Sequence, residues 1–306
     1  MDAIDLFAGA GGFTTGATAA GVRVVYAANH WRAAVDAHAA NHPDVTHACQ
    51  DPHQADWHKL PRHDLLLASP SCQGHSRARG KDKPRHDAAR STAWAVVSCA
   101  EVHRSPFVIV ENVPEFKKWV LFPEWESAMA KLGYTMAPHE VDAADHGVRQ
   151  HRRRLFLVFS RSVAPLTLRL PRRQHRSIRD AIGWDEGTWR PWASAVRKRP
   201  LSEKTLERIL AGRAEHGDRF LVAYYGSTRG GRSLDRPIGT LTTRDRYAVI
   251  RGGDMRMLSV REAQEAMSFP DDYLLPSRRA DAMMMLGNAV APTVARDFCA
   301  ALLRVA

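Results

Sequence analysis

Short apolar runs alternate with helix-like stretches along the first half of the chain. Runs of four to eight apolar residues bounded by polar or glycine residues are typical of buried strands, and longer stretches with apolar residues three and four apart are typical of helices. By these criteria we predict strands at 3–7, 22–28, 64–68, 107–110 and 154–159 and helices at 12–21, 31–41 and 91–104. Gly21 is expected to stop the first helix and Ser91 to cap the third.

The alternation of strands and helices predicts an open α/β fold with a doubly wound, mostly parallel sheet. The continuous apolar run FVIV at 107–110 is typical of a strand buried on both faces of such a sheet. We assign residues 1–165, completed by 279–306, to this larger domain. Residues 166–278 are assigned to a second, smaller domain because the pattern changes there.

The second half is less regular. Residues 168–180 and 189–200 are rich in Arg, Pro and Trp without a sustained period, and β-like runs follow at 219–226 and 237–250. A helical period returns at 259–267, where Ser259 and Glu262 have capping-box spacing. The last helix is expected at about 291–305, with Pro292 in its first turn.

Composition excludes several classes of protein. Among 306 residues, 44% are hydrophobic and 25% charged, and no apolar run approaches the roughly 18 residues of a membrane span. The start MDAIDLFAGAGG lacks the features of a secretory signal, so we expect a cytoplasmic protein without a membrane partner. The four cysteines form no CxxC pair and the 15 histidines no HExxH pattern, so we predict no metal site.

The net charge of +11 fits either an arginine-rich protein with no special partner or a protein that binds a polyanion. The distribution of the charge favours nucleic acid. Residues 77–90 carry Arg77, Arg79, Lys81, Lys83, Arg85 and Arg90 against only Asp82 and Asp87, and RLPRRQHR and RKRP add to the predicted second domain.

The segment DLFAGAGGFTTG (5–16) follows the first strand and opens the first helix. Glycines there let a backbone approach a ligand, and the helix N-terminus offers unpaired N–H groups. The dinucleotide fingerprint GxGxxG is not met, because Gly9 and Gly11 fill its first two glycine positions but Thr14 stands at the third. His30 also stands where such an enzyme would have an acid. The loop therefore predicts a nucleoside-bearing cofactor, with a tight turn without a ligand as the alternative.

Cys72 in SPSCQGHS and Glu111 in ENV follow two predicted parallel strands. Open α/β sheets bind ligands at the carboxyl ends of their strands, so a thiol nucleophile and a carboxylic acid would share one cleft. Gln150, Arg152 and Arg154 alternate into another strand, and a period of two sends them to one face. The alternatives are a chance turn cysteine, a solvated loop acid and a solvated basic edge strand.

Taken together, these motifs resemble the cytosine-5 DNA methyltransferases, in order along nearly the whole chain except about 165–235. DLFAGAGGFTTG resembles the family's first motif, SPSCQGHS its nucleophile motif, and QHRRR its QxRxR motif. RMLSVREAQEAMSFPDDY (256–273) and GNAVAPTVARDF (287–298) resemble the ninth and tenth motifs, and PIGTLTT the segment that closes a target-recognition domain. The resemblance implies a class I methyltransferase fold in which residues 166–278 recognise the target.

The resemblance also implies roles. Cys72 would add to carbon 6 of an extruded cytosine, Glu111 would contact ring N3, and Arg154 with Arg152 would hold the O2 side. Pro70, Ser71, Gln73 and Gln150 would shape the base pocket and loop. DNA contacts are expected from Arg77, Arg79, Lys81, Lys83, Arg85, Thr240 and Thr242. S-adenosylmethionine would be bound by Asp5, Phe7, Ala8, Gly9, Gly11, Gly12, His30, Trp31, Asp51, Asn288 and Val290.

Two departures from the family pattern concern the same sites. Ser71 stands directly before the cysteine, where the family usually has proline, which puts the shape of the base pocket in doubt. His30 stands where the family has the carboxylate that binds the cofactor ribose. A histidine can still hydrogen-bond a hydroxyl, but when protonated it cannot supply an anionic acceptor.

The predicted activity is methyl transfer to carbon 5 of cytosine in double-stranded DNA, by a monomeric enzyme with a cognate restriction endonuclease as a possible partner. An enzyme acting on cytosine in RNA and a catalytically silent DNA-binding paralogue are the alternatives.

Overall fold

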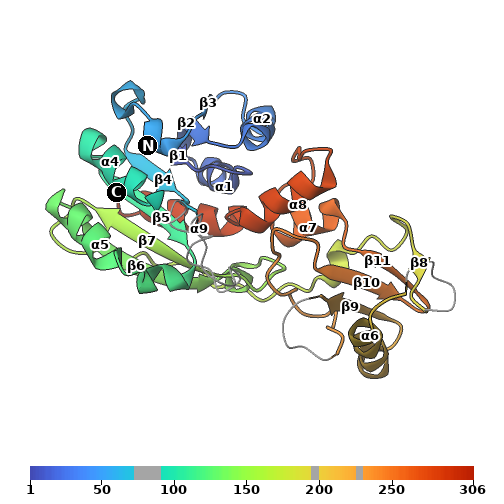
Figure 1. The fold of residues 1–306 in the computed structure, drawn as a ribbon. Helices are drawn as coiled ribbons and strands as arrows, with labels where there is room; N and C mark the ends of the chain where they lie inside the picture. The colour runs from blue at the N-terminus through green and yellow to red at the C-terminus, as the bar shows by residue number, and fades with distance from the viewer. Residues whose placement is uncertain (72–90, 194–199, 225–229) are drawn as a thin grey trace.

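The computed structural model describes residues 1–71, 91–193, 200–224 and 230–306. Most of these residues lie in elements around two sheets, which occupy opposite ends of the molecule (Figure 1). Cys72, Gln73 and the basic residues between 77 and 85 lie outside the described residues.

The larger sheet has seven strands in the order β3-β2-β1-β4-β5-β7-β6. The first five are parallel, and β7 pairs antiparallel with both β5 and β6. This confirms the predicted doubly wound, mostly parallel sheet. Its strands are β1 Asp2–Leu6, β2 Arg23–Asn29, β3 Thr46–Cys49, β4 Leu65–Ala68, β5 Phe107–Asn112, β6 Thr135–Asp142 and β7 Arg153–Ser160.

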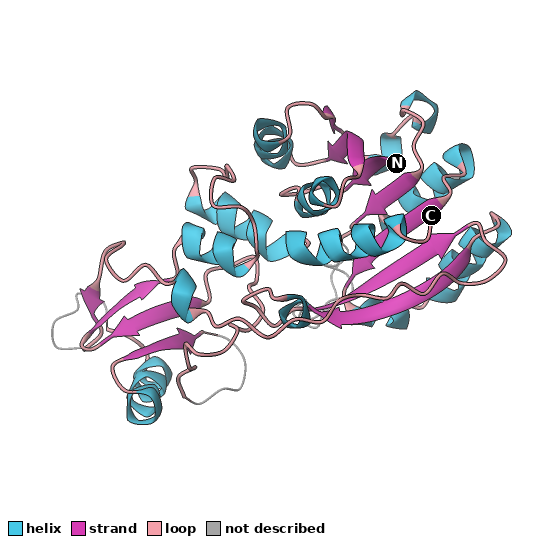
Figure 2. Cartoon of the chain, turned by 180° about the vertical axis from the view of Figure 1, so that it is seen from behind, coloured by secondary structure: helices cyan, strands magenta, loops and turns pink. Residues whose placement is uncertain are grey.

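Helices cover both faces of this sheet because alternate strand residues point to opposite faces. Along β4, Leu65 and Leu67 join the apolar cluster of α1, α2 and α9, whereas Leu66 and Ala68 join that of α4 and α5. Figure 2 shows these layers from behind. The helices are α1 Gly12–Ala19, α2 Arg32–Asn41, α4 Trp94–His103, α5 Phe122–Lys131 and α9 Pro292–Leu303.

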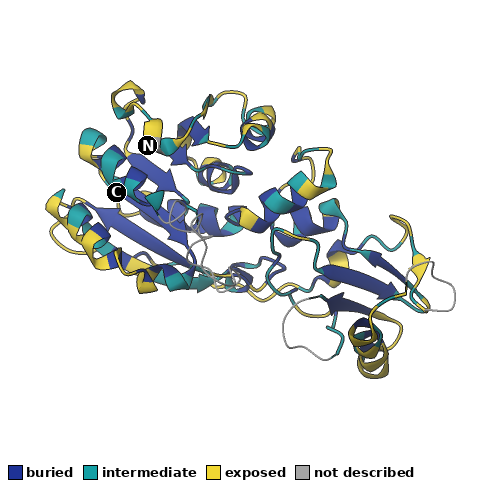
Figure 3. Ribbon diagram, in the orientation of Figure 1, coloured by how far each residue is buried: buried dark blue, intermediate teal, exposed yellow. Residues whose placement is uncertain are grey.

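The smaller sheet is antiparallel, in the order β8-β11-β10-β9. Its apolar residues pack on α6 through Ile209, Phe220 and Ile250, and α7 and α8 lie between the two sheets (Figures 1 and 3). The elements are β8 Arg190–Pro191, α6 Glu203–His216, β9 Arg219–Ala223, β10 Tyr247–Arg251, β11 Asp254–Met257, α7 Val260–Ala266 and α8 Arg279–Asn288. The domain boundaries at 165 and 278 stay a prediction.

Several local predictions are confirmed and two are wrong. The capping box of Ser259 and Glu262 forms, and Pro292 lies in the first turn of α9. Ser91 does not cap α4, which begins at Trp94 after the buried N-cap Ala93; the Ala93 carbonyl accepts a hydrogen bond from Trp125 Nε1. The β-like run at 237–250 forms a named strand only from Tyr247 onward.

Candidate active site

The register of the parallel strands brings most of the predicted site residues to one edge of the large sheet. Leu6 pairs with both Ala28 and Ala68, and Ala68 pairs with Val110. Each strand therefore ends at the same level, where open α/β sheets bind ligands. The residues at this edge are the glycine loop after β1, His30 and Trp31 after β2, Asp51 after β3, Pro70 and Ser71 after β4, and Glu111, the second-last residue of β5.

The glycine loop has a left-handed backbone at three positions. Gly9 and Gly11 have φ of 54° and 75°, which glycine adopts freely, but Phe7 has φ of 63°. A non-glycine residue in this conformation costs about 1–2 kcal/mol. The conformation of Phe7 is held by its carbonyl, which accepts a 3.3 Å hydrogen bond from Ser69 Oγ, and by the Ala8 amide, which donates to the Ala28 carbonyl. Such outliers cluster at ligand sites.

Most glycines of this segment contact the protein. A Cβ at Gly12 would lie 1.9 Å from the Val290 carbonyl oxygen, and one at Gly16 would lie 2.4 Å from that of Pro292. A Cβ at Gly11 would lie 2.5 Å from the Tyr273 hydroxyl. At Gly9 the described residues offer only the Phe7 carbonyl oxygen, at 3.7 Å. Close packing of α1 on α9 explains Gly16, close packing on Val290 just before α9 explains Gly12, and Gly9 is the position open to a ligand.

The side chain of Asp5 lies beneath the loop and is fully buried. Its Oδ2 accepts hydrogen bonds from the Thr14 amide at 3.2 Å and the Thr14 hydroxyl at 2.8 Å, which fixes the first turn of α1. Burial raises the pKa of Asp5 to about 7, against the opposing effect of the Thr14 hydrogen bonds. Asp5 thus supports the loop from inside the protein.

The remaining predicted cofactor residues surround the loop at the sheet edge. His30 and Asp51 are exposed, and Trp31 is half-buried at the N-terminus of α2, where its amide donates to Asn29 Oδ1. Asn288 is exposed at the end of α8, and Val290 is buried against Gly12. A half-buried aromatic, an exposed acid and an open glycine on adjacent strand ends fit a nucleoside-bearing ligand.

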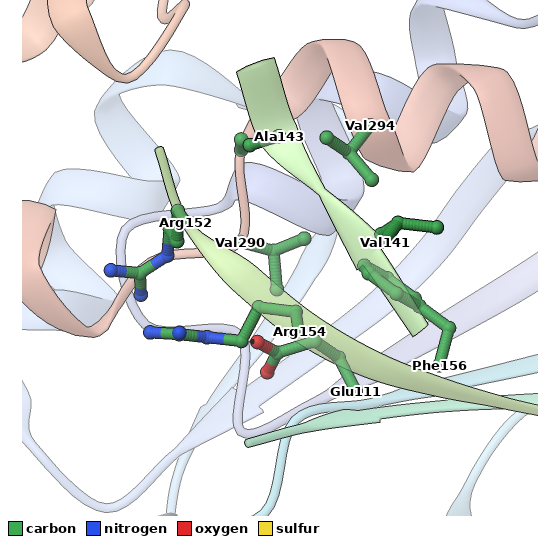
Figure 4. Close-up of a pocket in the computed structure, with 9 residues that line it drawn as sticks. Glu111, Val141, Ala143, Arg152, Arg154, Phe156, Val290 and Val294 are labelled. Carbon is green, nitrogen blue, oxygen red and sulfur yellow. Dashed lines mark ion pairs between the residues drawn. The ribbon is translucent and has the colours of Figure 1, made fainter. Parts of the chain in front are cut away.

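Glu111 and Arg154 form the polar centre of a small hollow at the same edge (Figure 4). Arg154 Nε lies 2.9 Å from Glu111 Oε1, and the Glu111 side chain is only 7% exposed. Burial raises the pKa of Glu111, although the charges of Arg154 and Arg152 oppose this. The hollow is lined by Glu111, Val141, Ala143, Arg152, Arg154, Phe156, Val290, Ala291 and Val294.

Two residues that the sequence did not indicate hold the segment that leads to Cys72. Asn112 Nδ2 donates to the Pro70 carbonyl at 3.1 Å, and the Ser71 amide donates to Thr92 Oγ1 at 3.1 Å. The last described residue before Cys72 is therefore hydrogen-bonded, and its neighbour Pro70 is tied to the residue after Glu111. The position of Asn112 beside Glu111 in ENV was the one available signal.

Of Gln150, Arg152 and Arg154, Arg154 pairs with Glu111, and the convergence of the three side chains on one ligand stays a prediction. Arg152 is 2% exposed, and its guanidinium donates to the carbonyls of Leu241 at 3.3 Å, Gly287 at 3.0 Å and Ala289 at 2.9 Å. Gln150 is fully buried, and its Oε1 accepts from the Leu241 amide at 2.7 Å. These two side chains bind backbone, so they position the segments around the hollow.

The segment that contains Thr240 and Thr242 is held along residues 149–151. The Ile238 amide donates to the Arg149 carbonyl, and the His151 amide donates to that of Ile238. The hydroxyls of Thr240 and Thr242 donate to the backbone carbonyls of His151 and Arg244. Their predicted DNA contacts stay a prediction.

Within the described ranges, no group of three or more His, Cys, Asp or Glu side chains is arranged to hold a metal ion. Over the same residues no helix is long and apolar enough to cross a membrane.

Comparisons with solved structures agree with this architecture. Residues of the whole chain superpose on the Dnmt2 methyltransferase of S. pombe with a TM-score of 0.70, 15% identity and coverage of 100% of this chain and 99% of the other. The methyltransferase EhMeth of Entamoeba histolytica gives a TM-score of 0.72 at 12% identity, with coverage of 100% and 98%. At these identities the likeness establishes the fold, which is that of a methyltransferase.

Sequence comparison identifies the family. The C-5 cytosine-specific DNA methylase family matches residues 1–304. The Type II methyltransferase M.MthTI of Methanothermobacter thermautotrophicus is 28% identical over 332 aligned positions, which cover 97% of this chain and 95% of the relative. The chain belongs to the C-5 cytosine-specific DNA methylase family and is a DNA (cytosine-5)-methyltransferase.

Proposed function

We propose that the chain methylates carbon 5 of an extruded cytosine in duplex DNA through a transient bond between Cys72 Sγ and carbon 6. The observation that carries this proposal is the buried pair of Glu111 and Arg154. Asn112, the residue after Glu111, donates a hydrogen bond to the Pro70 carbonyl and so connects this pair to the segment that leads to Cys72. The adduct makes carbon 5 nucleophilic. Loss of the carbon-5 proton after methyl transfer then expels the thiolate.

Glu111 and Arg154 are assigned to the edge of the base. The raised pKa of Glu111 lets its carboxyl group hold a proton and hydrogen-bond ring N3 as the thiolate adds. Arg154 keeps Glu111 in place and presents the remaining N–H donors of its guanidinium to O2. Arg152 is assigned a positioning role, because its guanidinium donates to the backbone carbonyls of the segments around the hollow. The attacking thiol must reach the face of the ring, so the base has to leave the stack.

The methyl donor is proposed to be S-adenosylmethionine, which supplies an electrophilic methyl group. Gly9 leaves room for it beside the loop, Trp31 offers a face for adenine, and Asp51 offers an acceptor for the adenine amino group. Val290 lines the hollow around Glu111 and packs against Gly12. His30 would hydrogen-bond a ribose hydroxyl without the fixed negative charge of a carboxylate.

The DNA is proposed to lie across the basic residues 77–90 and the smaller sheet, which would read the groove. A monomeric state, a cytoplasmic location and a cognate restriction endonuclease remain predictions.

Trapping on duplex DNA that contains 5-fluorocytosine tests the proposal. In the presence of S-adenosylmethionine the wild type is expected to form an adduct that survives denaturation, and Cys72→Ala to form none. Cys49→Ala is the matched control, because Cys49 is an exposed thiol on β3, and should form the adduct normally. An adduct that persists in Cys72→Ala overturns the assignment, and methyl incorporation into tRNA but not duplex DNA favours the RNA alternative.

A further inference from the structure

A polar cluster formed by Asp5, Thr14, His38, His47 and Tyr273 lies against the glycine loop. It joins β1, α1, α2 and β3 to residues 268–275, which follow α7. The cluster is buried except at His47, and none of its members is used in the chemistry proposed above.

Tyr273 supports the loop directly. Tyr273 is buried, with 7% of its surface exposed. Its hydroxyl donates a hydrogen bond to the Ala10 carbonyl. The same oxygen would lie 2.5 Å from a Cβ at Gly11, so the loop backbone rests on this hydroxyl. The aromatic ring is fixed by Phe269, whose ring centroid lies 4.8 Å away.

His38 supports the loop from α2. A Cβ at Gly11 would lie 3.0 Å from His38 Cδ2, so the imidazole forms the other part of the surface under Gly11. His38 Nε2 lies 3.0 Å from Thr14 Oγ1, and His38 Nδ1 lies 2.8 Å from His47 Nε2.

The order of donors fixes this chain of hydrogen bonds. Thr14 Oγ1 donates to Asp5 and therefore accepts from His38 Nε2–H, which leaves His38 Nδ1 to accept from His47 Nε2–H. His38 is thus held neutral in one tautomer. Burial, and then the neighbouring His42 and His47, lower its pKa to about 3, so it stays neutral at every pH at which the enzyme would work.

Residues 273–274 are also anchored to α2. Asn41 Nδ2 donates to the Leu274 carbonyl at 2.8 Å, and the Leu274 amide donates to Asn41 Oδ1 at 2.7 Å. His42 Nε2 lies 3.1 Å from Thr15 Oγ1 and 3.5 Å from the Tyr273 hydroxyl. A shift of residues 273–274 would therefore move the support of the loop.

We infer that Tyr273 and His38 are positioning residues for the methyl-donor loop, and that they make donor affinity depend on the segment after α7. This inference rests on the proposed function, because it assumes that the donor binds at the loop. Neither residue touches the reacting atoms, so they should affect donor binding and leave the chemical step unchanged.

Calorimetric titration of the full chain with S-adenosylhomocysteine tests the inference without turnover. Tyr273→Phe removes only the hydroxyl, and we expect the Kd to rise about 5–10-fold, the effect of losing one buried hydrogen bond. The KM for S-adenosylmethionine should rise similarly, with kcat at saturation within twofold of the wild type. Tyr134→Phe is the matched control, because the buried Tyr134 hydroxyl donates to the Ser105 carbonyl far from the loop.

A second pair of variants repeats the test for the imidazole. His38→Gln should weaken S-adenosylhomocysteine binding, whereas His63→Gln, at a buried histidine that contacts the Pro61 carbonyl, should not. Wild-type affinity in both Tyr273→Phe and His38→Gln overturns the inference. Equal losses in the variants and their controls also overturn it, since the effect is then general destabilisation. A wild type that binds no S-adenosylhomocysteine instead overturns the donor site itself.

Discussion

Arg152 and Arg154 lie two residues apart in one motif, and the structure predicts that their substitution has different consequences. Arg152→Met should destabilise the protein, because Arg152 donates to three backbone carbonyls from two separate segments, at Leu241 and at Gly287 and Ala289. Arg154→Met should mainly reduce turnover, because Arg154 is paired with Glu111 at the hollow.

The magnitude for Arg152 follows from its partners. Hydrogen bonds from a charged donor contribute about 1.5–3 kcal/mol each, and the carbonyls that lose a buried donor are not resolvated. Methionine removes the buried charge together with the donors, which limits the loss. We therefore expect the free energy of unfolding to fall by about 3–5 kcal/mol, a large part of the 5–15 kcal/mol typical of a folded protein.

Urea unfolding followed by fluorescence measures this loss, and Arg153→Met is the control. Arg153 has a side chain that is 74% exposed and a 3.4 Å contact with Glu140, so its substitution should change stability by less than about 0.5 kcal/mol. If Arg152→Met unfolds at the wild-type urea midpoint but loses turnover a hundredfold, the structural role of Arg152 is refuted. Arg152 would then be assigned to contact with the cytosine base.

Three further predictions concern the donor side of the enzyme. Gly16→Ala should lower the free energy of unfolding by about 1–3 kcal/mol despite the gain in helix propensity, because the added Cβ would meet α9. Gly253→Ala is the control in the same urea unfolding assay and should be near neutral, because no atom lies within 4 Å of its added Cβ. The pKa of Asp5, near 7 in the folded protein against 3.8 ordinarily, means that its contribution to stability is present below pH 4 and is lost as pH rises to 7, by up to about 4 kcal/mol. Asp5→Asn should remove that loss, and a stability difference from the wild type that stays constant between pH 5 and 8 would contradict it. His30→Glu should bind S-adenosylmethionine at least as tightly as the wild type, and a large loss in calorimetry would overturn the assignment of His30 to the ribose.

The elements that the sequence predicted well are those with a strong apolar period. FVIV in β5 and LLLA in β4 are almost fully buried, and their continuous apolar residues were enough to predict the two strands. The strand β6 was missed, because it lies at the sheet edge, contains Pro138 and is largely half-exposed, so it has no continuous apolar run. α6 was missed because only three of its residues, Thr205, Ile209 and Gly212, are buried, so its sequence has no strong apolar period.

The candidate site was predictable where motif position determines geometry. Glu111 lies at the end of the strand β5, so its place at the sheet edge could be derived, and its contact with Arg154 required only that β7 pair with β5. The roles of Arg152 and Gln150 could not be derived, because their partners are backbone atoms more than 85 residues away in sequence. The role of His38 could not be derived either, because its contacts with Thr14 and His47 depend on how α2 packs on α1 and β3.

The contact of α1 with α9 has a consequence for synthesis of the protein. α1 is synthesised before α9, and the roughly 270 residues that separate the two helices correspond to about 14–54 s at ordinary elongation rates. Throughout that interval the face of α1 that carries Gly12 and Gly16 has no permanent neighbour. Newly made chains therefore cannot complete the packing of α1 until residues 290–296 have been synthesised.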